Sequence, residues 1–297
     1  DFADRGAETP SPRFCHACPG NFVTAPVTGL VTKRQRCSKT GPIVSLHRRL
    51  MFLFDIVLLF SAGFLSSAVN AIAGGGTFLT FGAMTLVGVP PIMANATSSV
   101  TQFPGYVTSA LAYRTEIREA GREAWVLAGL SLAGSLAGAL ILVSMSNPSF
   151  RSLVPWLLLA ATMIFAAGPY LRPKHLHAER PVTRLGMLGQ FITSIYGGFF
   201  GAGMGIMMLA VLGITKGGDY HKLNALKNFI AVIIAFIAIV VFSTGGVVAW
   251  LPALVMIPGG ALGGYAGVWL ARRVPQAVIR AVVVAVGLLL SWYYFSS

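Results

Sequence analysis

Residues 70–79 read NAIAGGGTFL and lie inside a long apolar part of the chain. A glycine in a helix interior costs about 1 kcal/mol relative to alanine, so three in succession predict that a helix breaks here. Inside a bilayer, non-helical backbone is tolerated only where protein or a water-filled cavity satisfies its polar groups. If the flanking segments cross a membrane, Gly74, Gly75 and Gly76 are therefore candidates for the wall of a cavity.

The composition is that of a membrane protein. Of the 297 residues, 55% are hydrophobic and only 10% are charged, whereas a soluble domain carries about 25% charged residues. Continuous apolar runs long enough to cross a bilayer recur along the chain, and they lack the alternation of a membrane β-barrel. The sequence predicts an all-α polytopic protein, expected as a multi-pass protein of the inner (cytoplasmic) membrane.

The first 50 residues differ from the rest, with eight Lys or Arg, three acidic residues and no apolar run. Cys15, Cys18 and His16 suggest zinc, but a structural zinc site needs four well-spaced ligands, so we expect no metal. The sequence from Met51 looks like a natural start beside a first membrane helix. We interpret residues 1–50 as a disordered basic leader or an upstream extension.

The remainder of the chain is an internal repeat. The glycine motif AGGGTFL at residue 73 recurs as AGMGIMM at residue 202, an offset of 129 residues. The same offset pairs Asn95 with Asn224, and Gly134 and Gly138 with Gly263 and Gly267, for which we predict close helix packing. We predict a first membrane repeat over 51–171, a basic cytoplasmic linker over 172–184 and a second repeat over 185–297.

Each half contains five apolar segments. We expect them at 52–73, 77–89, 95–113, 124–145 and 152–171, and at 185–201, 204–215, 222–242, 249–270 and 279–295. The second segment of each half is too short to cross about 30 Å of hydrocarbon as a helix. The first two segments of each half should therefore form a helical hairpin broken at the glycines, followed by three membrane-spanning helices.

The charges of the loops predict the orientation of the halves. Loops with basic residues fall on one face when each half has five segments, and the positive-inside rule makes that face cytoplasmic. These residues are Arg114, Arg118, Arg122, Arg172, Lys174, Arg180, Arg184, Lys216, Lys222, Arg272 and Arg273. An odd number of segments inverts the second half relative to the first, as in many secondary transporters. The net charge of +13 is thus explained by basic residues that set the membrane topology, and we expect no nucleic-acid partner.

Candidate site residues gather at the two breaks and in the third segments. A helix that starts after a break directs free N–H groups and a positive dipole end toward an anion. The third segments add hydroxyl and amide groups at helical spacing. The candidates for substrate binding are Gly74, Gly75, Gly76, Asn95, Thr97, Ser98, Ser99, Gln102, Gly201, Gly203, Gly205, Asn224, Lys227 and Asn228.

Lys227 is the ionisable member of this set. A lysine in a membrane helix costs about 2.5–3.5 kcal/mol on insertion scales, so a function is expected of it. It is either a contact for an anion or a side chain that snorkels to the nearby cytoplasmic surface. No acidic residue lies deep in an apolar segment, which argues against a cation pathway, and we find no nucleophile–base pair. We therefore expect no enzyme activity and no cofactor.

The motifs resemble a known family. Residues 70–114, NAIAGGGTFLTFGAMTLVGVPPIMANATSSVTQFPGYVTSALAYR, are similar to the first conserved block of the TauE/SafE (TSUP) transporters. The second block looks like GGFFGAGMGIMMLAVLGI at 197–214 followed by LNALKNFIAVIIAFIAIVVF at 223–242. The resemblance covers about 51–297 and implies transport of sulfite, sulfoacetate or a related organosulfur anion.

These observations predict a transporter that exports a small anion by alternating access. A passive anion channel, or uptake or export of another small carboxylate or sulfonate, remains open as an alternative. The expected partners are the anionic substrate, the lipid bilayer and a possible second copy in a homodimer.

Overall fold

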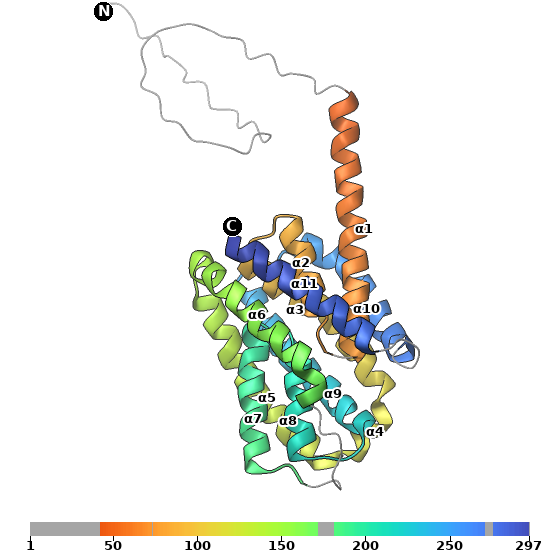
Figure 1. Ribbon diagram of the computed structural model, residues 1–297, viewed down its shortest axis with the longest axis vertical. Helices are drawn as coiled ribbons and strands as arrows, with labels where there is room; N and C mark the ends of the chain where they lie inside the picture. Colours follow the sequence, from red (N-terminus) through yellow and green to blue (C-terminus); the bar gives the residue numbers. More distant parts are fainter. Residues whose placement is uncertain (1–41, 73, 172–180, 271–275, 297) are drawn as a thin grey trace, which may run out of the picture.

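The computed structural model describes residues 42–72, 74–171, 181–270 and 276–296, and these residues fold into a bundle of helices (Figure 1). In chain order the helices are α1 (Pro42–Ile72), α2 (Thr77–Leu86), α3 (Pro91–Ala112), α4 (Arg114–Glu119), α5 (Gly121–Ser144), α6 (Asn147–Leu171), α7 (Arg184–Phe199), α8 (Met204–Thr215), α9 (Tyr220–Thr244), α10 (Trp250–Leu270) and α11 (Gln276–Ser296). Each of the ten expected apolar segments corresponds to one helix, and α4 is an additional short helix between two of them.

Within the described residues, four helices are long and apolar enough to cross a membrane. They are the segments Leu53–Ala71, Gly121–Ser144, Asn147–Ala167 and His221–Thr244. The helices α2 and α8 are apolar but shorter, with 10 and 12 residues. This confirms the all-α polytopic class.

Three helices begin four or more residues before the expected position. The helix α1 begins at Pro42 rather than near residue 52, α3 at Pro91 rather than near 95, and α6 at Asn147 rather than near 152. All three have a proline in the first turn, where it is favoured because its missing N–H would have no partner there. Residues 1–41 and 172–180, which hold the candidate zinc ligands and most of the expected linker, lie outside the described residues.

Both glycine motifs interrupt the helices. The first break separates α1 from α2, and the second separates α7 from α8. Gly74 has a φ of +85° and Gly203 a φ of +76°, a backbone region that is costly for residues with a Cβ atom. Because α2 packs on α1 and α8 packs on α7, each break turns the chain back on itself, as a broken hairpin requires.

The halves are tied together by exchanged helix pairs. The helix α10 packs along α1, and α5 packs along α7, so each half receives a helix of the other. A Cβ atom at Gly267 would lie 2.7 Å from the Ala68 Cα, and one at Gly138 would lie 2.0 Å from the Ile195 carbonyl oxygen. These contacts confirm that the paired glycines Gly138 and Gly267 allow close helix packing.

The third helices and the last helices complete the bundle. The helices α3 and α9 pack on each other, and α6 and α11 lie side by side, as Figure 1 shows. Near the breaks, the buried ring of Phe81 in α2 packs edge-on against Phe200, with ring centroids 5.8 Å apart. This aromatic contact joins the first short helix to the second break.

Candidate functional site

The two glycine breaks meet in the protein interior. A Cβ atom at Gly74 would lie 2.7 Å from the Gly205 Cα, and one at Gly205 would lie 2.6 Å from the Gly74 Cα. No side chain separates the two backbones at this point. Two segments that are 129 residues apart in the repeat therefore form one junction.

A cavity of about 20 Å³ lies between the breaks and the third helices. Its walls come from α2, α3, α7, α8 and α9. The lining residues are Thr77, Ser99, Gln102, Tyr106, Gly197, Gly201, Met204, Ile234, Ala235 and Ala238. A buried water needs roughly 10–15 Å³, so the cavity is closed around space for about one water molecule.

The starts of both short helices face this cavity. Thr77 is the first residue of α2 and Met204 is the first residue of α8, and both line the cavity. The positive ends of two helix dipoles thus converge on the same small volume. Helix N-termini of this kind are suited to binding an anion.

Asn70 organises the first break. The Gly76 N–H donates to the Asn70 Oδ1 at 2.9 Å, and the Asn70 Nδ2 donates to the Tyr106 hydroxyl at 3.2 Å. The Tyr106 hydroxyl donates to the Gln102 Oε1 at 3.3 Å. The Ser66 hydroxyl closes the loop from the other side by donating to the Gly76 carbonyl at 2.7 Å. The irregular backbone of the break is therefore satisfied by the side chains of Asn70 and Ser66. Asn70 is joined in turn to Tyr106, which lines the cavity.

Lys227 lies beside this network and does not reach the surface. Its side chain is buried, with 1% of the residue exposed, and its Nζ donates to the Asn70 carbonyl at 3.0 Å. The snorkelling interpretation of Lys227 is therefore wrong. A cation at the C-terminal end of α1 interacts favourably with the negative end of that helix. Asn70 also contacts Tyr106, which lines the cavity. The positive charge of Lys227 is therefore separated from the cavity wall by one residue, Asn70.

The paired asparagines Asn95 and Asn224 bind across the halves. The Asn95 Nδ2 donates to the Phe199 carbonyl at 2.8 Å, at the end of α7. The Asn224 Nδ2 donates to the Ala71 carbonyl at 3.3 Å, at the end of α1, and to the Tyr113 hydroxyl at 3.3 Å. The last carbonyls of a helix have no partner within it. Each asparagine thus satisfies the end of the other half's broken helix.

Asn228 stands apart from the other polar candidates. It is fully buried, and neither atom of its side-chain amide has a hydrogen-bond partner among the described residues. Buried amides are normally paired, so an unpaired one calls for a specific explanation. Asn228 lies seven residues before Ala235, on the same stripe of α9 that lines the cavity.

The remaining candidates lie away from the cavity. The Thr97 hydroxyl accepts from the Ala249 N–H at 2.9 Å, in the link before α10, and the Ser98 hydroxyl donates to the Ala94 carbonyl of its own helix. A Cβ atom at Gly75 would lie 2.0 Å from the ring of Phe165 in α6, and one at Gly203 would contact Ala161 of the same helix. The structure thus brings Ser99, Gln102 and Gly201 to the cavity wall. Four other candidates, Gly75, Thr97, Ser98 and Gly203, lie elsewhere.

Several residues of the site were absent from the sequence-based candidates. They are Asn70 and the lining residues Thr77, Tyr106, Gly197, Met204, Ile234, Ala235 and Ala238. Asn70 and Thr77 could have been predicted, because they are the nearest polar residues on either side of Gly74, Gly75 and Gly76. Tyr106 follows Gln102 by one helical turn and could have been found by the same spacing argument.

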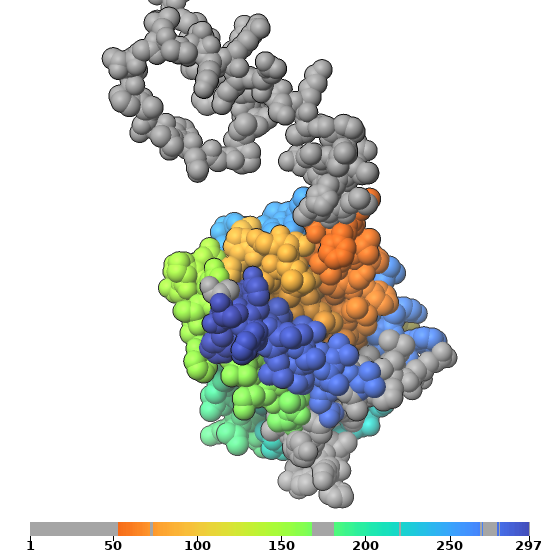
Figure 2. Space-filling model, turned by 45° about the horizontal axis from the view of Figure 1, so that its top comes forward, coloured from red at the N-terminus to blue at the C-terminus, as the bar shows by residue number. Residues whose placement is uncertain are grey.

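A larger cavity of about 540 Å³ lies on the outside, where α1, α2 and α11 meet; Figure 2 shows these helices side by side. Its lining is mostly aliphatic, and it includes exposed residues such as Leu65, Leu86 and Leu289. A crevice with mostly aliphatic walls offers a charged solute few hydrogen-bond partners to replace water. We therefore assign the candidate site to the smaller cavity, whose wall carries hydroxyl and amide groups.

Comparisons with known proteins agree with these features. The chain is 27% identical over 251 residues to a "Probable membrane transporter protein" of Haemophilus influenzae, covering 81% of this chain and 97% of that relative. It is 26% identical over 242 residues to "Probable membrane transporter protein ORF9" of Sinorhizobium sp., covering 80% of this chain and 90% of the relative. It is 24% identical over 235 residues to "Probable membrane transporter protein YfcA" of Escherichia coli K12, covering 79% and 87%.

The family model described as sulfite exporter TauE/SafE matches residues 59–294. This range takes in both glycine breaks, both cross-bound asparagines and every residue of the small cavity. The proteins of this family are membrane transporters and not enzymes. The chain belongs to the sulfite exporter TauE/SafE family of membrane transporters.

Proposed function

We propose that the protein moves a small anion, with sulfite, sulfoacetate or a related organosulfur anion as the first candidates. The observation that carries the proposal is the junction at Gly74 and Gly205. Beside it, the first residues of two helices line one small cavity, and a buried lysine lies behind the cavity wall. The family's description as sulfite exporters supports sulfite as the first candidate. The cytoplasmic membrane is the proposed location.

The chemistry of the cavity wall suits an anion. The described residues that line it carry hydroxyl and amide groups but no carboxylate. Thr77, Ser99 and Tyr106 can each donate an O–H group to an oxyanion. Lys227 supplies a positive charge behind the wall, where the low dielectric of the interior makes that charge effective at short range. The amide of Asn228 is a further proposed ligand from α9.

We infer that the two halves are inverted repeats that rock around this cavity. The matching contacts of α10 with α1 and of α5 with α7, and the reciprocal bonds of Asn95 and Asn224, support a two-fold relation between the halves. Inverted repeats with broken helices at the midplane are typical of alternating access. A cavity of about 20 Å³ must widen to admit a tetra-atomic anion, so the described state corresponds to a closed one.

The test is flux of sulfite in proteoliposomes that contain the purified protein. Lys227→Met removes the charge while keeping a long apolar side chain, and we expect the rate to fall by about tenfold or more, which corresponds to 1.4 kcal/mol. Lys222→Met is the matched control, because Lys222 is half-exposed and pairs with Glu119 at 2.9 Å. It should transport at close to the parental rate.

Other outcomes would redirect the proposal. Equal flux in the parent and the Lys227 variant would reject a role for this lysine in binding. Transport of small carboxylates in place of sulfite and sulfonates would change the substrate class. Flux that does not saturate, together with single-channel currents, would identify a passive anion channel.

A further inference from the structure

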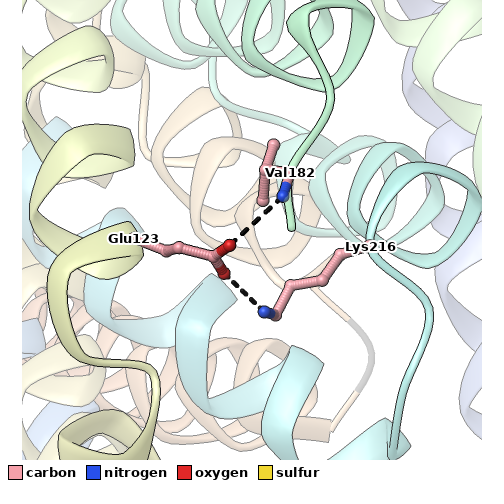
Figure 3. Close-up of polar contacts among 3 residues, drawn as sticks. All are labelled: Glu123, Val182 and Lys216. Carbon is pink, nitrogen blue, oxygen red and sulfur yellow. Dashed lines mark hydrogen bonds and ion pairs between the residues drawn. The ribbon is translucent and has the colours of Figure 1, made fainter. Parts of the chain in front are cut away.

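Glu123 joins three segments at one end of the molecule. It lies in the first turn of α5, and its Oε2 lies 2.5 Å from the Nζ of Lys216, which follows the last residue of α8 (Figure 3). Its Oε1 accepts from the Val182 N–H at 3.3 Å, just before α7. The Lys216 side chain is 8% exposed and that of Glu123 is 32% exposed. One carboxylate therefore links the first half to both ends of the second half's broken hairpin.

The helix α8 connects this ion pair to the cavity. Met204 at its start lines the cavity, and Lys216 follows its end. A helix of 12 residues is about 18 Å long and moves as a rod. Beyond Lys216, the link to α9 contains Gly217 and Gly218, both with positive φ. Short links of this kind absorb the dihedral changes of a hinge, whereas the ion pair holds α8 to α5.

The opposite end of the molecule has no such pair at the equivalent positions. The repeat offset of 129 residues matches Lys216 with Val87, and Glu123 with Pro252. Val87 and Val247 pack against the hydrophobic core cluster that contains Val248. The equivalent positions therefore hold a partly buried ion pair at one end of the molecule and apolar packing at the other.

We propose that the Glu123–Lys216 ion pair is a latch that keeps the cavity closed toward the end of the molecule formed by residues 114–123 and 216–222. Opening of the cavity toward this end requires the carboxylate and the ammonium to separate, so that α8 can move away from α5. The latch rests on the alternating-access part of the proposed function. It does not depend on which anion is carried.

The latch is tested by the accessibility of a cysteine in the cavity wall. Ser99→Cys is introduced after Cys15, Cys18 and Cys37 are replaced by serine, and a membrane-impermeant maleimide is applied to sealed vesicles from each side. A separate Thr115→Cys reporter in the exposed part of α4 identifies the side that carries the latch. Glu123→Gln combined with Lys216→Gln removes both charges, so that neither is left buried without its partner.

We expect labelling of the Ser99→Cys reporter from the latch side to rise about fivefold or more in the double variant, within the usual range of coupling between sites. Glu119→Gln combined with Lys222→Gln removes the neighbouring exposed pair and should leave labelling unchanged. Lys216→Arg keeps the charge and should also label at the parental rate.

Unchanged labelling in the double variant would overturn the latch, and so would an equal rise from both sides. If the double variant does not fold, Glu123→Asp decides instead, because the shorter side chain lengthens the ion pair while keeping its charge. It should raise labelling from the latch side alone, and parental labelling would refute the proposal. The assay contains none of the candidate substrates, so loss of the latch and failure of the proposed substrate are separate results.

Discussion

Asn70 takes part in three of the hydrogen bonds that hold the site together. Its Oδ1 accepts from the Gly76 N–H, its Nδ2 donates to Tyr106, and its backbone carbonyl accepts from Lys227. It is 2% exposed, so water cannot replace these bonds. By the repeat offset its counterpart is Phe199, whose carbonyl is bound by Asn95. The first break is therefore held by a side chain of its own half, and the second lacks an equivalent amide.

Two substitutions at Asn70 separate its structural role from its electrostatic one. Asn70→Ala leaves the Gly76 N–H without its acceptor, which costs about 1–3 kcal/mol, and should lower the unfolding temperature in detergent as well as the flux. Asn70→Asp keeps that acceptor but adds a negative charge next to Lys227. We expect it to unfold nearer to the parental temperature while the KM for the anion rises. An unchanged KM in a folded Asp variant would contradict an anion site at this cavity.

At the scale of elements, the sequence predicts where helices break but not what holds the breaks. Three glycines and their repeat predict the interruptions before α2 and α8, because helix propensity acts locally. The exchange of Asn95 and Asn224 between halves could not be predicted, since it depends on how α3 and α9 pack at the centre. The same applies to Thr97, which shares its helix with Ser99 yet faces the link before α10. Helical spacing identifies a face of a helix but not its neighbour.

The close approach of the two breaks gives a prediction for α8. Gly205→Ala places a methyl group 2.6 Å from the Gly74 Cα, and the backbone at Gly74 cannot move without disturbing α2. Overpacking of this kind costs about 1–3 kcal/mol. We expect a lower unfolding temperature and a marked loss of flux.

Gly129→Ala is the matched control for Gly205→Ala. Gly129 is also a helical glycine, but nothing lies within 4 Å of a Cβ atom placed there. Alanine is favoured over glycine in a helix by about 1 kcal/mol, so this variant should be as stable as the parent or more so, with normal flux. Normal flux in both variants would show that the junction of the breaks is not needed for transport.

At the scale of the whole molecule, the two halves share a plan but differ in charge. The Asn95 and Asn224 bonds and the exchanged helices follow the repeat, whereas Lys227 matches Ser98 and Lys216 matches Val87 under the same offset. Among the residues whose burial the structure describes, the two buried lysines, Lys216 and Lys227, thus belong to the second half. Under the mechanism proposed above, one end of the molecule is closed by an ion pair and the other by apolar packing, and Lys227 is the cation that lies beside the cavity.

This arrangement predicts how transport responds to voltage. If one negative charge crosses without a coupled ion, a potential of 100 mV is worth about 2.3 kcal/mol, which sustains an anion gradient of roughly 50-fold. Proteoliposomes with an imposed potassium diffusion potential should therefore accumulate a monovalent sulfonate on the positive side, and the gradient should scale with the potential. Since the described cavity lining offers no carboxylate to carry a proton, we expect this dependence to persist when the pH gradient is collapsed. A gradient that ignores the potential and follows the proton gradient would instead establish electroneutral coupling, and the coupled proton would then need a carrier elsewhere in the protein or on the substrate itself.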